Sequence, residues 1–109
     1  VTLPLNAGLR ILASEQEWTD VYYSPIEERL VVDRSHSSLI DSDGNSTESG
    51  KLRLWPIVGS SNKQTTREPL DLTIVVDGSI IEIYANDQTI ITTRVYPWMQ
   101  NSLGVSLLV

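Results

Sequence analysis

The stretch Asp71-Leu-Thr-Ile-Val-Val-Asp-Gly-Ser-Ile-Ile-Glu-Ile-Tyr-Ala-Asn-Asp-Gln-Thr-Ile-Ile-Thr-Thr-Arg-Val-Tyr-Pro97 decides the fold class of this chain. Its first part has the period of two that marks a half-buried strand, with one face formed by Leu70, Leu72, Ile74 and Val76. Asp77-Gly78 follows as a hairpin signal, because glycine tolerates positive φ. Residues 80–85 form the next arm, Asn86-Asp87-Gln88 the next turn and residues 89–95 another arm. The stretch therefore predicts consecutive antiparallel strands joined by tight turns.

The rest of the chain shows the same kind of pattern and no usable helical periodicity. Alternating or β-branched segments occur at residues 9–13, 18–23, 30–34, 52–55 and 103–109. About eight short strands at regular spacing are typical of an antiparallel sandwich or barrel. We predict an all-β fold, an antiparallel β-sandwich of two packed sheets with jelly-roll or lectin-like character. Residues 1–109 form a single domain in this prediction.

Two polar stretches, residues 35–50 and 59–67, are predicted to be exposed loops. The first contains the sequon Asn45-Ser46-Thr47, so Asn45 is the expected glycosylation site. It also resembles a calcium loop, with Asp41, Asp43 and Asn45 at positions one, three and five. Position six has Ser46 instead of Gly and position twelve has Leu52 instead of Glu. We therefore predict no metal site.

Composition excludes several classes of function. The 109 residues carry a net charge of −6 with scattered basic residues, which argues against nucleic acid as a partner. No apolar run approaches the ~18 residues of a membrane span, so no membrane partner is expected. The absence of cysteine excludes disulfides and thiolate sites. Because the chain starts at Val1 without Met, we expect a processed or excised piece. The sequon at Asn45 favours a secreted protein.

The fixed polar positions of the chain resemble one known family. Tyr22-Tyr23-Ser-Pro and Leu30-Val-Val-Asp33-Arg34-Ser35, together with the stretch after Asp71, resemble the C-terminal β-sandwich module of glycoside hydrolase family 32. That family contains invertases, inulinases and fructosyltransferases. The similarity covers most of residues 9–109, with Gln88 where Gly is usual and Tyr84 where Phe is frequent. The turn without Gly is expected to place its positive φ at Asn86 or Asp87.

The resemblance implies that the chemistry of the family lies outside this chain. The family's Asp nucleophile and Glu acid belong to an N-terminal five-bladed propeller, near Asn-Asp-Pro, Arg-Asp-Pro and Glu-Cys motifs that do not occur here. We therefore predict no catalytic residue and no cofactor. Structural roles are expected for the remaining candidates: an ion pair with Arg94 or another base for Glu82, turn geometry for Asp77, an ion pair or a hydrogen-bonded strand end for Asp33, and an exposed loop for His36.

Sugar binding is the other chemistry to consider, because aromatic faces stack on sugar rings. The candidate carbohydrate-binding residues are Trp98, Tyr96 and Trp18. Trp98 follows Tyr96-Pro97 outside any predicted strand and is either exposed or part of the core. For Trp18 and Trp55 we expect core positions or partial burial.

Two functional hypotheses remain. The chain is a non-catalytic accessory module that stabilises or oligomerises the propeller of a fructan- or sucrose-active hydrolase. Alternatively, it is an autonomous lectin-like protein of the same fold. The expected partners are a carbohydrate or an absent catalytic propeller. A homo-oligomer is also expected, because residues 103–109 offer a free apolar edge.

Overall fold

The computed structural model describes residues 6–40, 46–58 and 65–108, and these form strands joined by turns and loops. The strands are β1 (Ala7–Ala13), β2 (Thr19–Ser24), β3 (Arg29–Asp33), β4 (Thr47–Lys51), β5 (Pro56–Val58), β6 (Thr65–Arg67), β7 (Leu72–Asp77), β8 (Ile80–Ala85), β9 (Thr89–Arg94) and β10 (Gly104–Leu108). No helix long and apolar enough for a membrane span occurs in these ranges.

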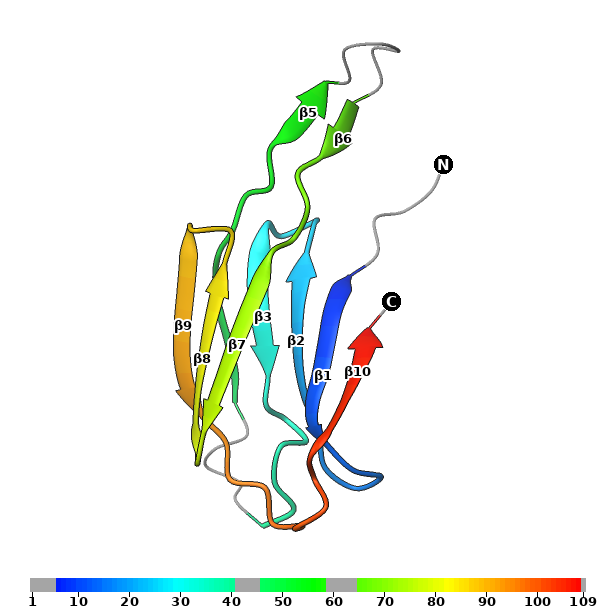
Figure 1. Cartoon of the computed structure of the whole chain (residues 1–109), viewed down its shortest axis with the longest axis vertical. Helices are drawn as coiled ribbons and strands as arrows, with labels where there is room; N and C mark the ends of the chain where they lie inside the picture. Colours follow the sequence, from blue (N-terminus) through cyan, green and yellow to red (C-terminus); the bar gives the residue numbers. More distant parts are fainter. Residues whose placement is uncertain (1–5, 41–45, 59–64, 109) are drawn as a thin grey trace.

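Two antiparallel sheets face each other, which confirms the predicted sandwich (Figure 1). One sheet has five strands in the order β10-β1-β2-β3-β4, and the other has three in the order β7-β8-β9. β4 and β9 lie together at one side, where the hydroxyl of Thr89 donates to the carbonyl of Lys51 at 2.5 Å. β5 and β6 pair only with each other and form a ribbon that extends beyond the sandwich.

Aliphatic side chains fill the space between the sheets. The buried cluster consists of Ile11, Val21, Tyr23, Leu30, Val32, Leu52, Leu54, Ile81, Ile83, Ala85, Ile91 and Val95. No tryptophan belongs to it. Trp55 was expected to be at least partly buried, yet 58% of it is exposed. It precedes the β5–β6 ribbon outside the sandwich, where the Arg53 guanidinium lies 5.4 Å from its ring centroid.

Two strands lie where the sequence predicted loops. β6 (Thr65–Arg67) falls within residues 59–67 and is held by backbone pairing with β5. β4 starts within residues 35–50 and ends at Lys51, and its side chains alternate between exposed and half-buried rather than between polar and apolar. It is held by backbone pairing with β3, from Arg29 opposite Lys51 to Asp33 opposite Thr47. A polar sequence is tolerated there because β4 is the edge strand of its sheet. Hydrophobic periodicity could not reveal a strand that buries so little.

The turns of the three-stranded sheet agree with the sequence. Gly78 has φ +59°, and the non-glycine turn places φ 52° at Asn86 and φ 53° at Asp87. The N–H of Gln88 donates to the carbonyl of Ala85 at 3.0 Å and closes this turn. The Asn86 side chain also accepts from the N–H of Asp71 at 2.9 Å. These bonds explain how a turn without glycine is stabilised.

Arg34 joins the two sheets at one end. Its buried guanidinium donates to the carbonyl of Arg94 at 2.7 Å and to the carbonyl of Ser46 at 3.1 Å. It also forms an ion pair with Glu48 at 2.9 Å. The side chain therefore ties β3 to the end of β9 and to the start of β4.

Gly8 allows the close approach of β1 and β2. A methyl group at this position would lie 1.9 Å from the carbonyl oxygen of Val21, which is backbone and cannot move aside alone. We expect Gly8→Ala to lower the free energy of unfolding by about 3 kcal/mol, measured by urea denaturation. Gly50→Ala is the control, since its methyl group would meet side chains alone: a Thr89 methyl at 3.2 Å and two Ile91 carbons at 3.8 Å. Equal effects of the two substitutions would contradict this account.

Candidate functional site

Glu17 is a fully buried carboxylate in the connection between β1 and β2. One oxygen accepts from the N–H groups of Leu39 and Trp98 at 2.8 and 2.7 Å. The other accepts from the N–H of Met99 at 2.8 Å and the hydroxyl of Ser102 at 2.7 Å. Burial by itself raises the pKa of Glu17, but these hydrogen bonds outweigh it and hold the pKa below its ordinary value of 4.5.

The Glu17 bonds bring three connections together at one end of the sandwich. Leu39 belongs to the β3–β4 connection, and Trp98 and Met99 belong to the β9–β10 connection. Two residues whose N–H groups bind Glu17 have exposed apolar side chains: Trp98 is 62% exposed and Leu39 is 51% exposed. A buried charge therefore positions a surface that contacts solvent.

Trp18, the residue after Glu17, is half-buried and in contact with two side chains. Its ring stacks on that of His36, with centroids 4.6 Å apart and an interplanar angle of 16°. The Arg10 guanidinium lies 4.9 Å from the Trp18 ring centroid. Arg10 is held there by Asp20, whose oxygens accept from it at 2.8 and 3.2 Å, and this hydrogen bonding raises the pKa of Arg10. The ring is therefore a packed element of the surface.

Among the described acidic side chains, Glu82 has a hydrogen-bond partner on its own strand. Glu82 accepts a hydrogen bond from the hydroxyl of Tyr84, two residues along β8, and this bond raises the pKa of Tyr84. Pairing of Glu82 with Arg94 or another base was expected. Arg94 instead donates to the hydroxyl of Ser79 at 3.4 Å, and none of the ion pairs among the described residues includes Glu82. A glycosidic acid needs a raised pKa. The one buried acid in the described ranges is Glu17, and its pKa is lowered.

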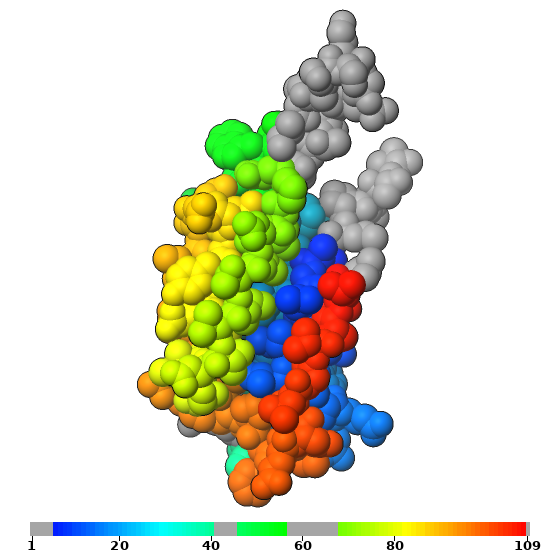
Figure 2. All heavy atoms as spheres, in the orientation of Figure 1, coloured from blue at the N-terminus to red at the C-terminus, as the bar shows by residue number. Residues whose placement is uncertain are grey.

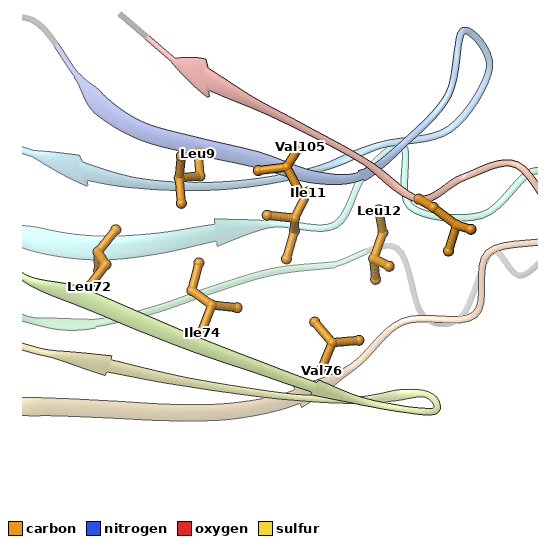
Figure 3. Close-up of a pocket in the computed structure, with 8 residues that line it drawn as sticks. Leu9, Ile11, Leu12, Leu72, Ile74, Val76 and Val105 are labelled. Carbon is orange, nitrogen blue, oxygen red and sulfur yellow. The ribbon is translucent and has the colours of Figure 1, made fainter.

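An apolar groove lies on the open side of the sandwich. It has a volume of about 460 Å³ and is lined by Leu9, Ile11, Leu12, Leu72, Ile74, Val76, Leu103 and Val105. Figure 2 shows β1 (blue) at the floor of the hollow between β7 (yellow-green) and β10 (red). In Figure 3 the side chains of Leu72, Ile74 and Val76 point from β7 toward those of β1 and β10.

Leu12 enters this groove because β1 contains a bulge. The pairing of β1 with β10 shifts register between Arg10 and Ala13, and Leu12 has φ 47°. Strict alternation would direct Leu12 to the face opposite Ile11. The bulge instead adds a second consecutive apolar side chain to the same groove.

Residues 5–109 match the family model described as "Glycosyl hydrolases family 32 C terminal". The chain therefore belongs to family 32, as a C-terminal domain. No curated protein sequence matches it significantly.

Solved family 32 enzymes contain the same domain. A β-fructofuranosidase from Aspergillus kawachii, complexed with glycerol, is 41% identical over 94% of this chain, with a TM-score of 0.81. A fructosyltransferase from A. japonicus is 42% identical over 95% of this chain, with a TM-score of 0.83. An exo-inulinase from A. awamori, at 23% identity and a TM-score of 0.70, shares the fold. The chain spans only 17% of the length of the first two.

The residues that the sequence singled out in this family 32 domain differ in their exposure and contacts. Tyr96 and Trp98 are exposed, at 44% and 62%, and Trp18 is engaged by His36 and Arg10. Asp33 accepts hydrogen bonds from the N–H and the hydroxyl of Ser35 at 2.9 and 2.6 Å. It is therefore a hydrogen-bonded strand end, which is one of the two roles expected for it. The predicted glycosylation site Asn45 lies outside the described residues.

Two features of this family 32 domain were missed by sequence reasoning. Glu17 has no distinguishing local pattern, because its donors lie 22 to 85 residues away along the chain. The groove did have a signal. The alternations at residues 70–76 and 103–109 mark two apolar faces, but only the topology shows that they flank one hollow.

We expect Glu17→Gln to lower the free energy of unfolding by about 2–3 kcal/mol at pH 7. The charge-assisted hydrogen bonds are lost, and the N–H groups of the new amide face protein groups that are themselves donors. The folded pKa lies below 4.5, so the stabilisation is present above that pH and is lost as the pH falls through the folded pKa. The difference between wild type and variant should therefore shrink below pH 4.5. Urea denaturation across pH 3–8 measures it.

Glu15→Gln is the matched control, since Glu15 is an exposed carboxylate in the same connection. It should leave stability within about 0.5 kcal/mol of wild type. A Glu17→Gln effect that is independent of pH would contradict the role given to the carboxylate charge.

Proposed function

We propose that this chain is the non-catalytic accessory domain of a family 32 enzyme that acts on sucrose or fructans, and that it stabilises the catalytic propeller. The match of residues 5–109 to the C-terminal family model carries the proposal. In addition, this chain corresponds to only 17% of the length of two solved relatives. The relatives are a β-fructofuranosidase and a fructosyltransferase, which is the basis for the substrate class.

The surface chemistry supports a docking role over a catalytic one. The buried carboxylate of Glu17 is held in its charged form by four donors, whereas a glycosidic acid needs a raised pKa. In contrast, large apolar side chains are exposed on the open side of the sandwich, including Leu103 at 74% and Leu107 at 75%. Exposed apolar patches of this kind mark surfaces that a protein partner covers.

A domain exchange in the A. japonicus fructosyltransferase tests the proposal. The segment of that enzyme that aligns with this chain would be deleted, or replaced by residues 1–109. We expect the deleted form to lose thermal stability and activity on sucrose, and the exchanged form to regain most of both, because the accessory domain buries apolar surface of the catalytic part. The intact enzyme is the reference. A deleted form as stable and active as the intact enzyme would overturn the proposal.

Sugar binding by the chain alone is the alternative, and Trp98 is its best candidate because the side chain is 62% exposed. The accessory role predicts that the folded chain shows no specific retention in a glycan-binding screen, since Trp18 is already engaged by His36 and Arg10. Retention of fructose-, sucrose- or glucose-type ligands that is lost in Trp98→Ala would favour the lectin-like function instead. Tyr96→Ala, which alters a neighbouring exposed ring, serves as the second variant.

A further inference from the structure

A charged hollow lies at the end of the sandwich from which the β5–β6 ribbon extends (Figure 1). It has a volume of about 320 Å³ and lies between the β2–β3 turn and residues 51–53. Its charged lining consists of Glu27, Glu28, Arg29, Lys51 and Arg53. Three of the eight basic residues of the chain therefore gather at one place, in a protein whose net charge is −6.

Two of these cations oppose each other in a way that folding disfavours. Arg29 and Lys51 are direct partners in the antiparallel register of β3 and β4. Directly opposed side chains project from the same face of a sheet, so like charges there repel each other and reduce stability. None of the ion pairs among the described residues includes either cation. Departures of this kind from favourable folding chemistry are expected at functional sites.

The same two side chains offer hydrogen-bond donors and no acceptor. The guanidinium of Arg29 donates from Nε to the hydroxyl of Ser49 at 2.9 Å and from Nη2 to the Ser49 carbonyl at 3.4 Å. These bonds fix the direction of the guanidinium and leave Nη1 as a further donor. The ammonium of Lys51 can only donate. An anionic ligand with several oxygen acceptors matches this set of groups.

The backbone beneath the hollow is held by both sheets. The carbonyls of Lys51 and Arg53 accept hydrogen bonds from side chains of β9 and of the β8–β9 turn, at 2.5 and 3.0 Å. Leu52 between them is buried in the core, and its N–H donates to the carbonyl of Glu28 at 3.0 Å. The charged side chains therefore project from a fixed base, which lowers the entropic cost of binding a ligand.

Glu28 has a strained backbone at the edge of the hollow. Its φ is 52°, in the left-handed region that residues other than Gly, Asn and Asp rarely adopt. Its carboxylate accepts from Nε of Arg53 at 2.6 Å and neutralises that guanidinium. Strained residues of this kind cluster at functional sites. With Glu27 as the other carboxylate of the lining, one positive charge remains in excess, and it belongs to the Arg29 and Lys51 pair.

We propose that the hollow binds a phosphate group between Arg29 and Lys51. A guanidinium and an ammonium are the side-chain groups that bind phosphate oxygens in proteins. Here they come from opposed strands, which suits a tetrahedral group with oxygens in several directions better than a planar carboxylate, because one guanidinium can satisfy a carboxylate. The site is independent of the accessory function proposed above.

The charge and size of the hollow limit the ligand further. The net charge of −6 repels a polyanion, whereas a single phosphate group meets only the local excess of positive charge. The hollow is larger than a phosphate ion, so it also admits part of a molecule that carries the group. The shared chemistry is therefore a phosphate group, either free or in a monoester.

Replacement of chloride by inorganic phosphate, at constant ionic strength and neutral pH, tests the site in residues 1–109. We expect the midpoint of thermal unfolding to rise more for the wild type than for Lys51→Gln, because a ligand that binds only the folded state stabilises it. The comparison with the variant removes the general stabilisation that phosphate gives to any folded protein. The same difference is expected in the exchanged fructosyltransferase, where the isolated chain need not fold.

The chloride arm distinguishes a binding role from a structural one. In chloride we expect the midpoint of Lys51→Gln to be no lower than that of the wild type, since a like-charge repulsion is removed. A lower midpoint of Lys51→Gln in chloride, with an equal rise of both proteins in phosphate, would overturn the proposal.

A titration with inorganic phosphate, followed by amide chemical shifts, locates the ligand. We expect the shifts to concentrate at residues 26–29 and 51–53. Arg29→Gln and Lys51→Gln should each raise the Kd at least about tenfold, because each loses a charge-assisted contact. Arg94→Gln is the matched control, since it removes the same charge from an exposed side chain at the other end of β9. It should change the Kd by less than about twofold, because solvent and salt screen a distant charge.

Two further ligands define the chemical class. Acetate should bind at least about tenfold more weakly than phosphate, and equal binding of the two would overturn the assignment of a phosphate group. Methyl phosphate that binds more tightly than inorganic phosphate identifies a monoester as the ligand, and weaker binding identifies free phosphate. Shifts that are absent, or that are spread over the basic residues with equal effects of Arg94→Gln and Lys51→Gln, would overturn the proposal.

Discussion

The apolar layer between the two sheets is the constraint on which the rest of this structure depends. Side chains such as Val21, Val32, Ile81 and Ile83 are fully buried because each sheet supplies the cover that the other needs. Where the three-stranded sheet ends at β7, that cover ends too, and Leu9, Ile74 and Val105 line an open groove. The same physical effect that folds the domain thus leaves it with a surface suited to a partner.

Two buried charged side chains determine how the ends of the sandwich are arranged. Arg34 reaches from β3 to Ser46 and Arg94, and Glu17 gathers the β3–β4 and β9–β10 connections. A buried charge is tolerated only when its hydrogen-bonding capacity is used, and four donors use that of Glu17. The exposed Trp98 is consequently displayed on a loop whose backbone is fixed. A fixed backbone at this end is consistent with the docking role that we propose.

The sequence predicted those elements whose local chemistry is sufficient to specify them. The β8 arm at residues 80–85, the turn at Gly78 and the positive φ at Asn86 and Asp87 follow from alternation and turn residues alone. β4 was missed because a polar edge strand is stabilised by its neighbour's backbone, which no hydrophobic pattern records. Glu17 was missed because its role arises from distant donors, and the exposure of Trp55 because it lies outside the sandwich.

Residue-resolved amide exchange along β7 tests the central claim most directly, namely the proposal that the rest of a family 32 enzyme covers the open side of this sandwich. In the isolated chain the account predicts slow exchange at Thr73 and Val75, which pair with β8, and fast exchange at Leu72, Ile74 and Val76, which face the free edge. In the exchanged enzyme the second group should become as slow as the first. Unchanged fast exchange at those three amides within the folded enzyme would contradict the account.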